Sequence, residues 1–318
     1  MRHMSLLKGV ASAASARASW CKGRTLLAAF LLTGGAAVQA QGVHTTARCE
    51  APNPPPPREG PELALPRHER AVWLGGGDIK TEFWAEKWQK NEIGFHLSDV
   101  HPQLVKYGNL MLEDGVSAPY FPKRILIPLC GKTLDMPFLV SQGHDVTGVE
   151  LIRDAMDDFV KENGVTNAPP ETTKGGMLVA EIPLKQAKGK EGAGLRFVIG
   201  DFFKFSNEVH GTYQACFDRG SLVAIDPSLR GKYADVLSKV MVKGSRVLLV
   251  TVEHGGFRGG KLGPPFSVPP EEVERLFATR GFKVESLMRE DRMPLEPSWA
   301  ARGATEFHER TWLLTKLK

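Results

Sequence analysis

The chain has 318 residues, of which 42% are hydrophobic and 24% are charged, as in soluble globular proteins. Its 33 glycines and 22 prolines are too few for a collagen-like chain, and four cysteines exclude a disulfide-dense scaffold. The formal net charge of +5 arises in residues 1–49, which hold six basic and no acidic side chains, so the nearly neutral remainder gives no reason to expect a nucleic-acid partner.

Residues 1–49 form a basic leader rich in Ala, Ser and Arg, as in targeting segments. Its apolar run from Thr25 to Ala40 covers 16 residues and ends in small side chains, which is also the pattern of a secretory signal. A membrane span needs about 20 apolar residues, so we expect no stable membrane anchor. Mitochondrial import, secretion and a disordered extension without a targeting role all remain open.

Residues 50–82 read as a linker. Pro54 to Pro57 favour extended chain, and Gly75 to Gly77 add a flexible joint. From Phe83 onward the sequence alternates apolar segments, so we expect one folded domain at 83–318.

Within this domain, short apolar runs alternate with segments of helical periodicity. Strands are expected at 124–128, 145–149, 195–199, 215–217, 247–252, 284–288 and 311–317, and helices at 133–142, 151–163, 233–242 and 270–280. This alternation predicts an α/β fold with an open, mostly parallel sheet covered by helices on both faces. Ligands of such sheets bind at the carboxyl ends of the strands.

Four of these strand ends carry candidate chemistry. The first runs into Pro128 to Lys132, where Gly131 permits a tight turn and a ligand could approach the backbone. The second ends in Glu150, whose carboxylate could accept hydrogen bonds from a ribose diol. The third ends in Gly200-Asp201, an acid that could accept from an adenine amino group, and the fourth ends in Asp218-Arg219.

Each strand end also has a purely structural interpretation. Glu150 could cap the following helix, Asp201 could stabilise a turn, and Asp218-Arg219 could form an internal ion pair. Taken together, however, the four ends fit an adenosine-type ligand. Because the chain lacks a glycine-rich dinucleotide fingerprint, S-adenosylmethionine is favoured over NAD.

Several segments resemble, in order, motifs of the thiopurine S-methyltransferase family. They are Phe83 to Trp88, Gly94 to His96, Pro128 to Lys132, Gly148 to Glu150, Asp218 to Pro227, Gly263 to Pro269, Glu272 to Phe277 and Leu313 to Thr315. The matches cover essentially all of 83–318. The resemblance implies a Rossmann-like class I methyltransferase fold, with a seven-stranded sheet whose last strands form an antiparallel pair. It also implies S-adenosylmethionine as donor, no metal, and a cytoplasmic monomer.

The resemblance further implies the site residues. The family's cofactor contacts fall on Trp84, Trp88, Phe95, Leu129, Glu150, Gly200, Asp201 and Arg219. Phe95 and Arg219 would also contact the substrate, an aromatic or heteroaromatic thiol such as a thiopurine. We hypothesise that Arg219 holds the anionic thiol and that Asp218 serves catalysis by orienting Arg219. In-line methyl transfer requires orientation and exclusion of water more than acid–base residues, so no catalytic triad is expected.

One departure concerns the acceptor. Some members of the family carry a second arginine shortly before a Ser-Trp pair; here the pair is Ser298-Trp299, the aligned position is Leu295, and Arg292 is nearby but displaced. Whether Arg292 replaces that arginine stays open at this point. Other soft acceptors, such as a selenium or tellurium compound or a small thiol, are therefore an alternative. Two further alternatives are a nucleotide-binding oxidoreductase and a non-catalytic binding domain, each built on a similar sheet.

Overall fold

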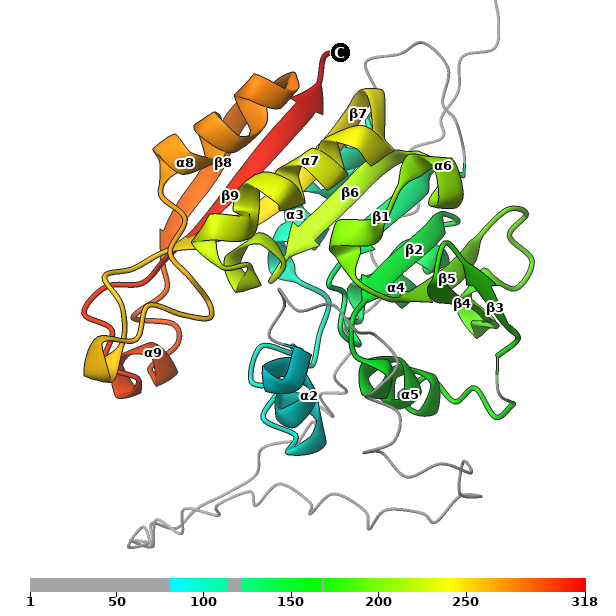
Figure 1. Ribbon diagram of the computed structural model, residues 1–318, viewed down its shortest axis with the longest axis horizontal. Helices are drawn as coiled ribbons and strands as arrows, with labels where there is room; N and C mark the ends of the chain where they lie inside the picture. Colours follow the sequence, from blue (N-terminus) through cyan, green and yellow to red (C-terminus); the bar gives the residue numbers. More distant parts are fainter. Residues whose placement is uncertain (1–80, 114–121, 168) are drawn as a thin grey trace, which may run out of the picture. The chain divides into compact units, whose positions relative to one another are not determined.

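The computed structural model describes residues 81–113, 122–167 and 169–318 (Figure 1). The expected leader and nearly all of the expected linker lie outside the described residues. The first described element is helix α2 (Thr81–Gln89), which begins two residues before the expected start of the domain. Among the helices that the structure describes, none combines the length and apolar character that a membrane span requires.

One sheet forms the centre of the described part of the chain. Its strands are β1 (Arg124–Pro128), β2 (Asp145–Glu150), β3 (Glu171–Lys174), β4 (Met177–Ile182), β5 (Gly194–Ile199), β6 (Tyr213–Arg219), β7 (Met241–Glu253), β8 (Phe282–Asp291) and β9 (His308–Lys316). Within the described residues they lie in the order β3-β4-β5-β2-β1-β6-β7-β9-β8. The strands from β5 to β7 in this order are parallel, and β9 runs antiparallel between β7 and β8. The antiparallel terminal pair that the resemblance implied is therefore present.

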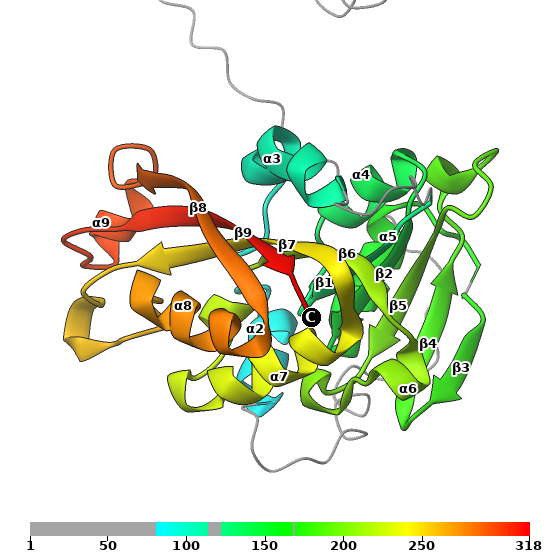
Figure 2. The same cartoon turned by 90° about the horizontal axis from the view of Figure 1, so that it is seen from above.

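Helices cover both faces of the sheet, as predicted. The described helices after α2 are α3 (Pro102–Leu112), α4 (Asp135–Ser141), α5 (Arg153–Glu162), α6 (Asn207–His210), α7 (Arg230–Val240), α8 (Pro270–Phe277) and α9 (Ser298–Ala301). Seen from above, α3, α4 and α5 lie on one side of the sheet, and α7 and α8 on the other (Figure 2).

The two faces bury two separate hydrophobic cores. Strand β1 shows why the sequence folds this way: Ile125 and Ile127 join the core under α3, α4 and α5, while Leu126 between them joins the core under α7 and α8. Because successive side chains of a strand point to opposite faces, a strand covered on both sides must be apolar at every position. This is why the predicted parallel strands appear as continuous apolar runs.

The sheet differs from the expectation in one respect: within the described residues it has nine strands rather than seven. The two additional strands, β3 and β4, form an antiparallel hairpin that pairs with the edge of β5. The four residues of β3 are polar and exposed, so they show no alternation that periodicity could detect. Helix α3 was also not predicted; His101 caps it, its Nδ1 accepting from the Gln103 N–H at 3.2 Å.

Candidate active site

The carboxyl ends of β1, β2, β5 and β6 meet at one edge of the sheet, beside helix α2 (Figure 1). The strand register brings them together: Pro128 pairs with Val149, Glu150 with Ile199, and Leu126 with Cys216. The structure thus places the four predicted strand ends beside one another, as parallel pairing requires.

The turn after β1 has an unusual backbone. Leu129 has φ +44° and Gly131 has φ +52°, both in the left-handed region. A non-glycine residue in this region costs on the order of 1 kcal/mol or more, and such strain gathers where a ligand is bound. Gly131 has a second constraint, because a Cβ at this position would lie 3.3 Å from the ring of Trp88. The position implied for cofactor contact, Leu129, is therefore also the strained one.

Glu150 lies at the end of β2 with its carboxylate buried. Its Oε2 accepts from the Gly131 N–H at 2.9 Å, and its Oε1 accepts from the N–H groups of Leu151 and Ile152 at 2.8 and 2.9 Å. Burial raises the pKa of Glu150, while these backbone hydrogen bonds act in the opposite direction. A carboxylate offers about four acceptor positions, so Oε2 retains room for one ligand hydroxyl. Glu150 thus caps the turn before α5 and still fits one hydroxyl of a ribose.

The aromatic residues of the first segment have different roles. Trp88 is 4% exposed and packs with Ala85, Ile152 and Ala155, so core packing accounts for its position. Trp84 is half-buried and meets the ring of Phe95 edge-on, with 5.7 Å between the ring centroids. Phe95 is 38% exposed. Of the aromatic residues expected at the site, Phe95 therefore offers the most accessible ring.

Arg219 and Asp218, which the sequence analysis treated as a pair, point in different directions. Arg219 Nη1 donates to the Phe95 carbonyl at 2.6 Å. Asp218 is fully buried, accepting from the Tyr233 hydroxyl at 2.7 Å and from the Leu222 N–H at 3.2 Å. Consecutive residues of a strand face opposite sides of a sheet, which explains the separation. These contacts join Asp218 to α7 and to the turn after β6, and the hypothesis that Asp218 orients Arg219 stays a prediction.

The third strand end is dominated by packing. A Cβ on Gly200 would lie 2.5 Å from Cγ of Met177, so the additional strand β4 itself requires glycine there. Asp201 caps a short 3-10 turn (Phe202–Lys204), its Oδ1 accepting from the Phe203 N–H at 2.8 Å. The structural interpretation of Asp201 as a turn residue therefore holds, and an adenine amino group would be an additional partner.

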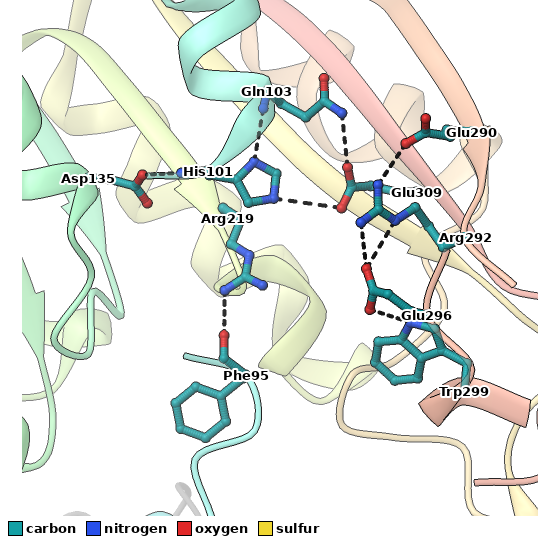
Figure 3. Close-up of polar contacts among 10 residues, drawn as sticks. All are labelled: Phe95, His101, Gln103, Asp135, Arg219, Glu290, Arg292, Glu296, Trp299 and Glu309. Atoms are coloured by element: carbon teal, nitrogen blue, oxygen red, sulfur yellow. Dashed lines mark hydrogen bonds and ion pairs between the residues drawn. The ribbon is translucent and has the colours of Figure 1, made fainter. Parts of the chain in front are cut away.

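A group of polar residues that the sequence analysis missed lies beside Arg219 (Figure 3). His101 donates its backbone N–H to Asp135 at 2.8 Å, and its Nε2 lies 3.7 Å from the Glu309 carboxylate. Gln103 Nε2 donates to Glu309 at 3.2 Å. These residues come from α3, α4 and β9, far apart in the sequence. The one local signal was His101 before Pro102, which is typical of a helix start.

These charges act on one another. Burial lowers the pKa of Arg219, and Asp135, Glu309 and Glu296 act in the opposite direction. Burial alone would raise the pKa of Glu309, but the hydrogen bonds from His101 and Gln103 and the nearby Arg292 outweigh it and lower that pKa. A cation withdrawn from water attracts an anion more strongly than an exposed one does. Arg219 is thus a partly desolvated cation that contacts the backbone of Phe95, whose ring is exposed.

The described part of the chain has the fold of a class I methyltransferase, and the comparisons with known proteins identify its family. Residues 79–317 match the family model described as thiopurine S-methyltransferase (TPMT). Curated relatives named thiopurine S-methyltransferase include one from Pseudomonas paraeruginosa, 34% identical over 75% of this chain and 100% of its own, and one from Pseudomonas aeruginosa strain UCBPP-PA14, 35% identical over the same shares. Another, from Methylococcus capsulatus, is 31% identical over 74% of this chain and 97% of its own.

The chain belongs to the thiopurine S-methyltransferase family. A solved S-adenosylmethionine-dependent methyltransferase from Anabaena variabilis has a TM-score of 0.47 at 14% identity, covering 77% of this chain and 98% of that one. That likeness is too distant to inform on the substrate. The family match begins near the first described helix and leaves the basic leader outside it.

Proposed function

We propose that this protein is an S-adenosylmethionine-dependent S-methyltransferase whose acceptor is an aromatic or heteroaromatic thiol. The observation that carries the proposal is the contact between Arg219 and the Phe95 carbonyl, at 2.6 Å. It joins the guanidinium at the end of β6 to the backbone of Phe95, whose exposed phenyl ring lies beyond the carbonyl (Figure 3). A flat aromatic thiolate combines the two features that such a pair binds, a ring to stack and a negative charge to neutralise.

The turn after β1 and the end of β2 fit the methyl donor. Leu129 begins the turn with a left-handed backbone. Glu150 keeps one acceptor position for a ribose hydroxyl, and Asp201 lies at the end of the neighbouring strand β5. When bound, S-adenosylmethionine supplies a methyl group activated by a sulfonium. Trp88 packs against Gly131 and so supports the turn after β1, and we assign it no contact with the methyl donor.

The chain's own contribution is to hold the acceptor sulfur as an anion in a fixed position. Arg219 favours the thiolate over the thiol because a positive charge nearby stabilises the ionised form. Phe95 fixes the plane of the acceptor ring, and Trp84 of α2 supports the Phe95 ring through its edge-on contact. Aromatic thiols ionise readily, so no general base is required. Asp218, buried against Tyr233, does not serve as one.

The test uses the purified full-length protein with S-adenosylmethionine and 6-mercaptopurine, following S-adenosylhomocysteine and methylated product. We expect turnover. Tight binding of S-adenosylhomocysteine without turnover would direct the search to selenium, tellurium or small-thiol acceptors. Stabilisation by a dinucleotide but not by S-adenosylmethionine would support the oxidoreductase alternative instead.

The role of Arg219 is tested by Arg219→Met. Loss of a charge-assisted contact worth about 1.5–3 kcal/mol predicts a decrease in kcat/KM of roughly 10- to 150-fold. The matched control is Arg275→Met, at an exposed arginine of α8, which we expect to leave kcat/KM unchanged. An Arg219→Met variant with unaltered turnover and unaltered cofactor affinity would overturn both roles assigned to this residue.

Location is a separate part of the proposal. The family resemblance favours the cytoplasm, and the basic leader of residues 1–49 offers import into mitochondria or secretion as alternatives. Sequencing the amino terminus of the mature protein separates the cytoplasm, where the leader would be kept, from the two alternatives, which would both remove it.

A further inference from the structure

Arg292 is the second arginine of the site, and two carboxylates occupy its guanidinium. Its Nη1 donates to Glu290 at 2.7 Å, while Nε and Nη2 both donate to the Oε1 atom of Glu296, at 3.1 and 2.5 Å. Burial alone would lower the pKa of Arg292, but the hydrogen bonds to Glu296 and Glu290 outweigh it and raise that pKa. Every side-chain nitrogen of Arg292 thus already donates to a carboxylate oxygen.

Glu296 is fixed in this position from its other side. Its Oε2 accepts from the Trp299 indole N–H at 2.8 Å. Trp299 in turn stacks on Phe307, with ring centroids 3.8 Å apart, and Phe307 is 2% exposed. A carboxylate that is held by a stacked ring loses little side-chain entropy when it pairs with a cation, so the pairing with Arg292 is built into the fold.

This arrangement faces Arg219 (Figure 3). Glu296 and Arg292 both lie close enough to affect the pKa of Arg219. Leu295, where the sequence comparison would place a second arginine, is 58% exposed. The region beside Phe95 therefore contains two arginines: Arg219, to which the proposed function assigns the acceptor, and Arg292, whose charge is compensated.

We propose that Glu296 is a specificity-determining residue, which compensates the charge of Arg292 so that the enzyme favours aromatic thiolates without a second negative charge over those that also carry a carboxylate. The inference rests on the proposed function. A carboxylated acceptor would have to displace Glu296 from Arg292 or bring its carboxylate near Glu296 and Glu309 unpaired, and both are unfavourable.

The experiment compares thiophenol with 3- and 4-mercaptobenzoate as acceptors for the full-length protein, measuring kcat/KM for each. The wild type is expected to prefer thiophenol. Glu296→Gln is expected to raise the ratio of the carboxylated to the uncharged acceptor about tenfold, equivalent to about 1.4 kcal/mol, because it exposes Arg292 to the second carboxylate. Glu290→Gln, which leaves the Trp299 contact intact, is expected to raise the ratio by a smaller factor and provides a second variant should Glu296→Gln fold poorly.

A double variant tests the mechanism. Adding Arg292→Gln to Glu296→Gln should return the ratio to the wild-type value; a gain that persists without Arg292 would overturn the inference. Unchanged ratios in both single variants would overturn it as well. The matched control is Glu285→Gln, at a surface carboxylate of β8 that pairs with Lys283 at 2.9 Å, and it should leave the ratio unaltered.

A binding measurement separates this inference from the proposed function. Calorimetric titration of benzoate into the protein saturated with S-adenosylhomocysteine should show about tenfold tighter binding to Glu296→Gln than to the wild type. If the wild type methylates no thiol at all, the proposed function fails, and this titration still decides whether Glu296 keeps Arg292 from carboxylates. Equal benzoate affinities would refute the inference even if thiol methylation is confirmed.

Discussion

Replacement of Asp218 by asparagine should make the protein's stability less dependent on pH. Burial raises the pKa of Asp218 from 3.8 to about 6, although hydrogen bonds from Tyr233, Leu222 and Ser221 act in the opposite direction. The folded protein therefore holds this proton more tightly than the unfolded chain does. Stability that is fully present below pH 3.8 is lost as the pH rises towards 6.

The magnitude follows from the same values. The rise from 3.8 to about 6 corresponds to about 3 kcal/mol, of which about 2 kcal/mol is lost between pH 4.5 and 7.5. Asparagine keeps an oxygen that can accept from Leu222 and Tyr233 but carries no charge. The free energy of unfolding of Asp218→Asn relative to wild type should therefore increase by about 2 kcal/mol over this interval.

Urea denaturation followed by tryptophan fluorescence, at several pH values from 4.5 to 7.5, measures the difference. Asp235→Asn, at an exposed carboxylate beside Arg280, reports the effect of losing a surface charge. Parallel pH dependence in Asp218→Asn and wild type would refute the reasoning. Thiol methylation by Asp218→Asn should stay within about threefold of wild type, since Asp218 bonds away from Arg219. A much larger loss at unchanged stability would restore the catalytic role first assigned to it.

Three further changes test the geometry of the strand ends. Gly200→Ala should destabilise the protein by about 1–3 kcal/mol in urea denaturation, because its Cβ would overlap Met177, and Met177→Ala in the same chain should restore part of the loss. Glu150→Gln should weaken S-adenosylhomocysteine binding at least about tenfold, as measured by calorimetry, because the amide NH₂ of glutamine would face backbone N–H groups. Unchanged affinity would argue against a contact between Glu150 and the methyl donor. Glu272→Gln should lower the free energy of unfolding by about 3 kcal/mol, because it leaves the guanidinium of Arg230 without its carboxylate and the Arg230 side chain is only 1% exposed. A loss below about 1 kcal/mol would contradict that account.

Local pattern alone predicted the framework of the fold. The continuous apolar run of β1 and the alternation of strands with helices indicated a doubly covered parallel sheet, because burial on two faces leaves no polar position. Glu150 and Arg219 were predicted as site residues because both end a parallel strand, and the carboxyl ends of parallel strands meet at the edge of the sheet where ligands bind. The β3–β4 hairpin was not predicted, since β3 is polar at all four positions and its pairing with β4 is a contact that periodicity does not express.

The sequence by itself determined the family, the sheet and the strand ends that carry the site, because these depend on the order of residues along single elements. Only the tertiary structure decided which neighbours those residues have. Asp218 meets Tyr233 on the neighbouring α7 instead of Arg219, and Glu309, on the last strand of the chain, lies beside His101. Such contacts follow from how the elements pack. Packing sets the burial and the charged neighbours of each side chain, and in this way it determined that Arg219, not Arg292, remains available to the acceptor.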